Sequence, residues 1–205
     1  MTITGFTQSD FNTFNIDGLD ARMEAIQSRI QPKFKEIGQE LTNYLSSKLG
    51  NELYLHIAKH ARRTVNPPKD TWLAISHNNR GYKKHPHFQV GLFDDHLFIW
   101  LACIYELDHK TAIAKKFLSH FDQFDNLDGE YVVSLDHMKK ESLPLEELEK
   151  RHLERFRDVK KAEFLIGKHL SPDDNLVSDG DELVSFIKET FDQLIPFYRL
   201  ALDAS

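Results

Sequence analysis

Hydrophobic positions in the first quarter of the chain recur at spacings of three and four, which predicts an amphipathic helix between Asp17 and Gly50. Asp17 is placed to cap the start of this helix, and Gly50 is placed to end it. Pro32 lies inside the pattern and has no amide hydrogen for the preceding turn, so it must kink the helix or begin a second one. The apolar face consists of Met23, Ile26, Ile30, Phe34, Ile37, Leu41, Leu45 and Leu49.

The hydrophobic period changes to two from Leu53 onward, where alternation predicts a strand over 53–58. The continuation of the pattern through Ala61 leaves a helix as the alternative. Asn66-Pro67-Pro68 breaks the chain after it. Further apolar segments predict strands at 72–77, 87–93, 131–135 and 162–166, and helices that begin near Asp108, Ser142 and Ser178.

Asp94-Asp95 lies between two apolar segments and predicts a two-residue hairpin turn. The turn would pair Phe93 with His96, and the pairing would then continue outward from the turn. Leu92 would face Leu97, Val90 would face Ile99 and Phe88 would face Leu101, which makes one face wholly apolar. The opposite face would carry His87, Gln89, Gly91, Phe98, Trp100 and Ala102.

This order of elements predicts a single layered α+β domain over residues 1–205. We expect a mixed or antiparallel sheet of four to six strands flanked by helices, with long N-terminal and C-terminal helices. The longest apolar run, 97–105, is far shorter than the roughly 20 residues of a spanning helix. The N-terminus lacks the pattern of a signal peptide, and the single cysteine, Cys103, cannot form an internal disulfide. We therefore expect a cytoplasmic protein with no membrane contact.

Positive charge is concentrated in one part of an acidic chain. The formal net charge is −6, yet the segment 56–87 holds seven Lys or Arg residues against one acid, Asp70. The rest of the chain holds 19 basic and 31 acidic residues, and five of the eleven histidines lie within 56–87. An acidic body opposes nonspecific contact with a polyanion, so the pattern differs from that of a general nucleic-acid binder.

Several motifs resemble those of the YktB-like family of uncharacterised bacterial proteins. They are the segment 60–72 (HARRTVNPPKDTW), the segment 79–84 (NRGYKK) and the segment 86–91 (PHFQVG). The resemblance extends over nearly the whole chain, from Gly5-Phe6 and the segment 18–24 (GLDARME) onward. It implies a compact α/β domain of a cytoplasmic bacterial protein, and it carries no activity and no catalytic residue.

The basic segment and the mixed face of the hairpin are the candidate ligand site. Guanidinium groups bind phosphate or carboxylate bidentately, and aromatic surface beside them suits a nucleotide-like molecule. The alternative is a solvated basic rim on the sheet. The candidate ligand-binding residues are His60, Arg62, Arg63, Arg80, Lys83, Lys84, His85, His87, Gln89 and Trp100.

His85 and His87 are two residues apart and would share one face of a strand, where they can act as metal ligands or as a general acid and base. A third ligand at a suitable spacing is missing, so we predict no metal site there. Nucleotide-binding glycine loops and nucleophile motifs are also missing from the sequence, and no cofactor is expected.

Three functions remain open at this point. The first is a protein that binds an anionic, phosphate-like or nucleotide-like small molecule. The second is a hydrolase that acts on a phosphoester with a histidine as acid or base. The third is a nucleic-acid or protein interaction module in which Tyr82, Phe88 or Trp100 stack on bases, although the net acidity disfavours nucleic acid. The sequence predicts no oligomeric state and no catalytic residue.

Overall fold

The computed structural model describes residues 2–204, and its centre is one antiparallel sheet of seven strands. The strand order across the sheet is β1-β2-β3-β4-β7-β5-β6. The strands are β1 (Tyr54–Ile57), β2 (Thr71–Ser76), β3 (His87–Leu92), β4 (Leu97–Cys103), β5 (Val132–Ser134), β6 (Leu143–Pro144) and β7 (Phe164–Leu170).

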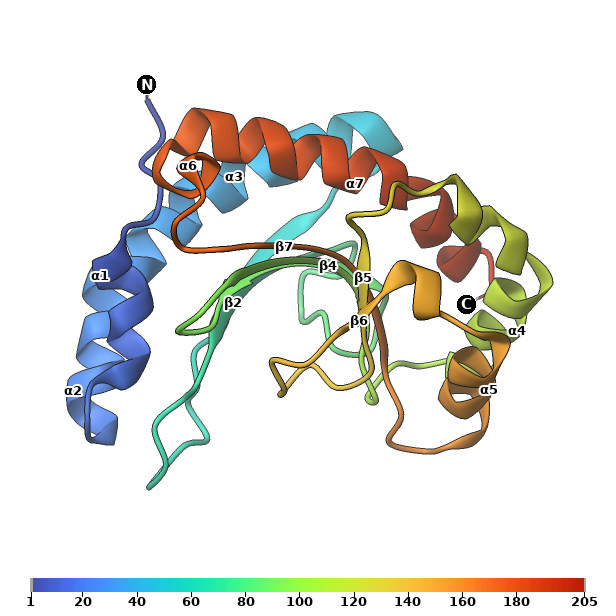
Figure 1. Cartoon of the computed structure of the whole chain (residues 1–205), viewed down its shortest axis with the longest axis horizontal. Helices are drawn as coiled ribbons and strands as arrows, with labels where there is room; N and C mark the ends of the chain where they lie inside the picture. The colour runs from blue at the N-terminus through green and yellow to red at the C-terminus, as the bar shows by residue number, and fades with distance from the viewer. Residues whose placement is uncertain (1, 205) are drawn as a thin grey trace.

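Helices cover one face and one end of this curved sheet (Figure 1). The α-helices are α1 (Gln8–Phe11), α2 (Leu19–Ala25), α3 (Gln31–Leu49), α4 (Lys110–Ser119), α5 (Lys150–Asp158), α6 (Asn175–Ser178) and α7 (Gly180–Leu202). A π-helical turn, Ile26–Ile30, joins α2 to α3, and short 3-10 turns lie at Asn12–Asn15, Phe121–Asn126 and Leu145–Glu147. The long helices α3 and α7 lie along the same face, while α4 and α5 pack together at one end (Figure 1).

The α+β class and the long helices near both ends of the chain are confirmed, but the expected range of four to six strands is wrong. The additional strand is β6, in which Pro144 pairs with Val132 and Leu143 pairs with Val133. The Ser142-Leu143-Pro144 sequence matches a helix start, whereas the helix here begins only at Lys150. Proline is tolerated in β6 because this strand forms the edge of the sheet, where a missing N–H breaks no ladder.

The hairpin of β3 and β4 has the predicted register. The amide of Phe93 donates to the carbonyl of His96 at 2.9 Å, and Val90 lies opposite Ile99. Both faces therefore carry the side chains expected of them, since a slip of one residue would exchange the two faces.

Other boundaries differ from the sequence expectations by a few residues. The first long helical segment begins at Leu19 after Gly18, whose φ of 84° suits glycine, so Asp17 is not its cap. Pro32 lies in the first turn of α3, directly after the π-helical turn Ile26–Ile30. The backbone stays helical from Leu19 to Leu49, so the change in hydrogen bonding just before Pro32 accommodates its missing N–H. Strand β7 runs from Phe164 to Leu170, so it begins and ends later than the strand predicted at 162–166.

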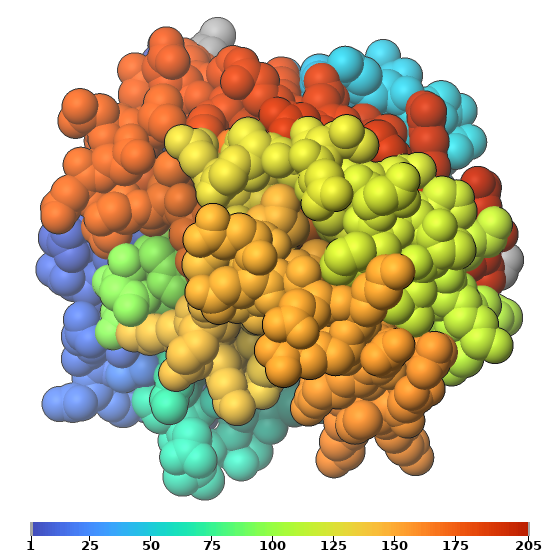
Figure 2. Space-filling model, turned by 45° about the vertical axis from the view of Figure 1, so that its right-hand side comes forward, coloured from blue at the N-terminus to red at the C-terminus, as the bar shows by residue number. Residues whose placement is uncertain are grey.

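The two faces of the sheet pack differently. The helix-covered face holds the main core, which includes Val90, Ile99 and Phe191. The other face carries a smaller cluster around Trp72, Phe98 and Trp100, which is buried under loops. Figure 2 shows the surface from the side of α5 and of the gold segment near residue 140. Among residues 2–204, no helix combines the length and apolar character needed to span a bilayer.

Candidate functional site

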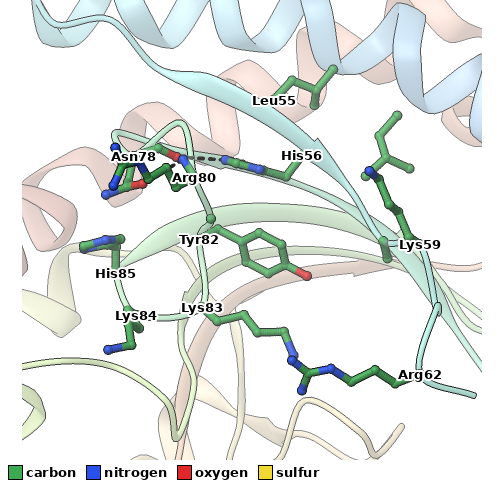
Figure 3. Close-up of a pocket in the computed structure, with 13 residues that line it drawn as sticks. Leu55, His56, Lys59, Arg62, Asn78, Arg80, Tyr82, Lys83, Lys84 and His85 are labelled. Atoms are coloured by element: carbon green, nitrogen blue, oxygen red, sulfur yellow. Dashed lines mark hydrogen bonds between the residues drawn. The ribbon is translucent and has the colours of Figure 1, made fainter.

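The basic segment forms an open cavity of about 790 Å³ beside the edge strand β1 (Figure 3). One wall comes from β1 and the residues that follow it, and the other comes from the loop between β2 and β3. The lining residues are Leu55, His56, Ile57, Ala58, Lys59, Arg62, Asn78, Arg80, Gly81, Tyr82, Lys83, Lys84 and His85.

Five cationic side chains line this cavity, and no acid is among the described residues that line it. Lys83 lies 3.7 Å from Glu106 and Lys84 lies 3.7 Å from Asp108, with all four side chains substantially exposed. Such exposed pairs hold a cation only weakly. Lys59, Arg62 and Arg80 make no ion pair with any residue from 2 to 204. The cavity is therefore positively charged.

Hydrogen bonds fix the loop between β2 and β3 against β1. The His56 Nε2–H donates to the carbonyl of Asn78 at 2.9 Å, and the Asn78 side chain accepts the amide of Arg80 at 2.8 Å. The amide of Asp108 donates to the carbonyl of Lys84 at 3.0 Å, which ties the far end of the loop to the chain after β4. The positions of Arg80 and Lys84 thus depend on main-chain contacts rather than on exposed ion pairs.

Tyr82 is the aromatic side chain of the cavity. Its hydroxyl accepts the indole N–H of Trp72 at 3.0 Å, and its ring lies between those of His56 and His87, with centroid distances of 5.5 and 4.9 Å. Burial raises the pKa of Tyr82, which keeps the phenol protonated. Figure 3 shows this ring with the cationic side chains around it.

The structure brings only half of the predicted ligand-binding residues to the cavity. Those that line it are Arg62, Arg80, Lys83, Lys84 and His85. The other five, which lie outside it, are His60, Arg63, His87, Gln89 and Trp100.

The buried side chains of His87 and Gln89 are hydrogen-bonded to each other. His87 is fully buried, its Nδ1–H donates to the carbonyl of His85 at 2.8 Å, and its Nε2 accepts from the Gln89 amide at 2.8 Å. Burial lowers the pKa of His87 to about 3, so the ring is neutral at physiological pH. A neutral ring with both nitrogens hydrogen-bonded has no proton to exchange with a ligand.

The remaining predicted residues have local partners. The His60 Nε2 lies 3.1 Å from the Thr71 hydroxyl, and burial, with a smaller effect of the Arg63 charge, lowers the pKa of His60 to about 4. Arg63 donates to the carbonyl of Asn66 at 3.3 Å. Trp100 is 4% exposed and packs in the smaller core. None of these three is a wall of the basic cavity.

Sequence reasoning did not place His56, Lys59 or Asn78 in the site. The signal that was available is the alternation along β1, where Tyr54, His56 and Ala58 share one face. Asn78 lies in the loop between β2 and β3. Its role depends on a hydrogen bond to a residue far away in the chain, which no local pattern reveals.

These features define an α+β protein with a seven-stranded antiparallel sheet and a basic cavity against its edge strand. Residues 6–198 match the model of a domain of unknown function, DUF1054, and the chain belongs to this family. The earlier resemblance to a family of uncharacterised bacterial proteins is thereby confirmed.

Similar proteins are found in several bacteria. A UPF0637 protein of Oceanobacillus iheyensis is 66% identical over 202 residues, covering 98% of each chain. A UPF0637 protein of Shouchella clausii is 59% identical and covers all of this chain and 98% of its own. A UPF0637 protein of Listeria innocua is 54% identical and covers 98% of this chain and all of its own. The names of these relatives state no activity.

Proposed function

We propose that this protein binds a small phosphate-bearing anion in the basic cavity. The observation that carries the proposal is that Lys59, Arg62, Arg80, Lys83 and Lys84 surround one cavity whose described lining includes no acid. Only Lys83 and Lys84 have acidic partners, and those pairs are long and exposed. The like charges around the cavity therefore repel one another, and an anion relieves that repulsion. The volume of about 790 Å³ lies within the range typical of small-molecule sites.

The lining residues divide the work of recognition. Arg62 and Arg80 present guanidinium forks that can bind phosphate oxygens bidentately, whereas the lysines supply point charges. Tyr82 and His56 supply ring surface beside them, so a nucleotide suits the site better than inorganic phosphate. Cytoplasmic location is part of this proposal, since phosphorylated metabolites are abundant there.

Calorimetric titration of the full chain with pyrophosphate and with ADP tests the proposal. Arg62→Ala and Arg80→Ala are each expected to weaken binding by about tenfold or more, because each removes a hydrogen bond to a charged group. Lys69→Ala is the matched control, since Lys69 belongs to the same basic segment but does not line the cavity. Binding that is undetectable, or equal in all four proteins, contradicts the proposal.

Phosphoester hydrolysis at the same cavity is the second candidate. His85 lines the cavity, and its ring lies edge-on to that of His77, with 4.5 Å between the ring centroids. The ring nitrogens of His85 make no hydrogen bond within the described chain. His85 replaces His87 as the histidine available for proton transfer. Release of phosphate from a generic phosphoester that is lost in His85→Ala favours a hydrolase, and release that persists in this variant excludes His85 from the reaction.

A further inference from the structure

A second cavity of about 670 Å³ lies beside the loop between β5 and β6, away from the basic segment. Figure 2 views the molecule from this side, where the gold segment near residue 140 approaches α5. The lining residues are Tyr105, Val133, Leu135, Asp136, His137, Met138, Lys139, Glu141, Ser142, Leu143, Arg155, Lys161 and Glu163. This cavity shares no residue with the basic one.

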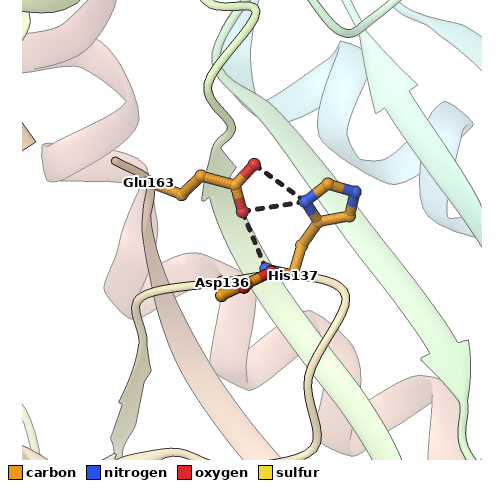
Figure 4. Close-up of side chains that lie close together, drawn as sticks. All are labelled: Asp136, His137 and Glu163. Carbon is orange, nitrogen blue, oxygen red and sulfur yellow. Dashed lines mark hydrogen bonds and ion pairs between the residues drawn. The ribbon is translucent and has the colours of Figure 1, made fainter. Parts of the chain in front are cut away.

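Three potential metal ligands meet in its wall (Figure 4). Asp136 and His137 follow β5, and Glu163 immediately precedes β7, which pairs with β5. Each residue offers one ligand atom, and these atoms all lie within 4.8 Å of one another. Sheet pairing therefore brings one imidazole and two carboxylates together from separate parts of the chain.

Glu163 is held rigidly in this cluster. It is 3% exposed and accepts the main-chain amides of Tyr105 at 3.1 Å and of His137 at 2.7 Å. The His137 Nδ1 lies 2.9 and 2.8 Å from its two oxygens. Ligands at about 2.0–2.2 Å from one metal ion lie roughly 3 Å apart, so the imidazole and carboxylate need move little to bind one.

Asp136 completes the cluster from its more exposed side. Its side chain is 43% exposed, it accepts the amide of Met138 at 3.0 Å, and its second oxygen lies 3.6 Å from the ammonium of Lys139. The amide contact orients the carboxylate. The long contact with Lys139 is one that a bound cation can displace.

Asp70 is the independent observation that points to a ligand. Its carboxylate is 1% exposed, and neither oxygen has a hydrogen-bond partner among residues 2–204. A buried carboxylate without a partner is costly and calls for an explanation. Burial opposes protonation of His137, but the carboxylates of Glu163 and, less strongly, Asp70 raise its pKa, so Asp70 lies near this ring. The ring of Trp72, two residues along from Asp70, lies edge-on to the His137 ring at 6.1 Å.

The tautomer of His137 connects these groups. The ring nitrogen that does not contact Glu163 points away from it (Figure 4). At 2.8 and 2.9 Å from the two Glu163 oxygens, Nδ1 carries the proton and donates it to that carboxylate. A metal ion that binds Nδ1 displaces this proton and leaves the other ring nitrogen protonated. A metal-bound histidine usually donates its other N–H to a carboxylate, and Asp70 is the unpartnered carboxylate near this ring.

We propose that Asp136, His137 through Nδ1, and Glu163 bind one divalent transition-metal cation, with Asp70 as the outer carboxylate that accepts the other His137 N–H when the metal is bound. A nitrogen ligand beside two carboxylates favours Zn²⁺ or Mn²⁺ over Ca²⁺ or Mg²⁺. The three ligands all line the cavity, which leaves the remaining coordination positions open toward it.

Calorimetric titration of the EDTA-treated full chain with ZnCl₂ and MnCl₂ tests the site. One site per chain is expected, with Zn²⁺ binding in the micromolar range or tighter. Asp136→Asn and His137→Ala are each expected to weaken it by about tenfold or more, because even outer carboxylates contribute about 10–100-fold. Asp136 is partly exposed, so its variant should fold even where a buried substitution does not.

Glu141→Gln is the matched control, since Glu141 lines the same cavity but lies outside the cluster. Asp70→Asn tests whether Asp70 supports the site from outside rather than binding the metal itself. This variant should weaken Zn²⁺ binding about tenfold while the stoichiometry stays at one ion per chain. Zn²⁺ binding that is absent, or that is unchanged in both Asp136→Asn and His137→Ala, overturns the proposal. Zn²⁺ binding that is unchanged in both variants would mean that other histidines bind the ion.

Discussion

Burial separates side chains that sequence alone groups together. His85 and His87 are two residues apart, but His85 lines the basic cavity while His87 is buried with both ring nitrogens hydrogen-bonded. Gln89 completes the hydrogen bonds of His87 and has no part in the cavity wall. His87 and Gln89 therefore stabilise the second face of the sheet. Of His85, His87 and Gln89, only His85 remains a candidate residue of the ligand site.

The buried histidines predict acid-sensitive stability. Burial lowers the pKa of His87 to about 3, while the unfolded side chain titrates near about 6.5. The unfolded state then binds more protons below about pH 6.5, so stability that is complete above this pH is lost as the pH falls. Between pH 7 and about pH 5.5 the loss is about 1 kcal/mol for this residue.

Urea unfolding at these two pH values measures the effect. His87→Gln is expected to reduce the pH dependence by that amount, whatever its effect on stability at pH 7. His109→Asn, at an exposed position with positive φ that asparagine tolerates, should keep the full dependence. An unchanged slope in His87→Gln would show that His87 titrates normally in the folded protein.

At the scale of elements, the sheet is built by pairing glycines with large aromatic rings. Gly91 of β3 lies opposite Phe98 of β4, and Gly167 of β7 lies opposite Trp100. The missing side chains leave room for the two rings to stack on the second face. These pairs explain why glycines occur inside strands, where they are otherwise unfavourable.

Gly167→Ala is expected to destabilise the protein by about 2–3 kcal/mol. An added Cβ would collide with the main-chain carbonyl of Ile99 and with the Trp100 ring, and neither can move without disturbing the ladder between β4 and β7. Thermal or urea unfolding measures the change. Gly129→Ala is the control, because nothing lies within 4 Å of its added Cβ, and it should shift stability by less than about 0.5 kcal/mol. Equal effects of the two variants would contradict this packing argument.

Across the whole molecule, charge is separated between one basic cavity and an otherwise acidic chain. The formal net charge is −6, although the segment 56–87 is strongly basic. A compact anion in the cavity contacts mainly the five cations that line it. An extended polyanion must run along that surface and meet repulsion.

A short oligothymidylate is therefore expected to bind no more than about threefold tighter than a mononucleotide at physiological salt. Fluorescence anisotropy at several salt concentrations measures both affinities and their salt dependence. A much tighter oligonucleotide complex, with affinity falling steeply as salt rises, would instead favour the nucleic-acid interaction module. Arg62→Ala should weaken binding of the mononucleotide whichever of the two results the oligonucleotide gives, because the substitution removes a cation from the cavity.

The sequence by itself determined the α+β class, the register of the β3–β4 hairpin and the position of the basic segment. Each of these depends on local information: a two-residue hydrophobic period, a short turn, or the order of charges along the chain. Strand β6 was not predicted because two residues are too few to show a hydrophobic period. They form a strand only because they pair with β5.

Only the tertiary structure decided which polar groups meet. Hydrophobic periodicity sets the face on which a strand residue lies, but it does not set which loops fold over that face. Antiparallel pairing puts the chain after β1 and the chain after β2 at opposite ends of the two strands. Arg62 and Arg80 share a cavity because the β2–β3 loop folds back, with Tyr82 against Trp72 and His56. Arg63, adjacent to Arg62, does not line this cavity. His137 and Glu163 meet because β5 pairs with β7. Contacts between distant segments depend on packing of the whole chain, and no short pattern in the sequence encodes them.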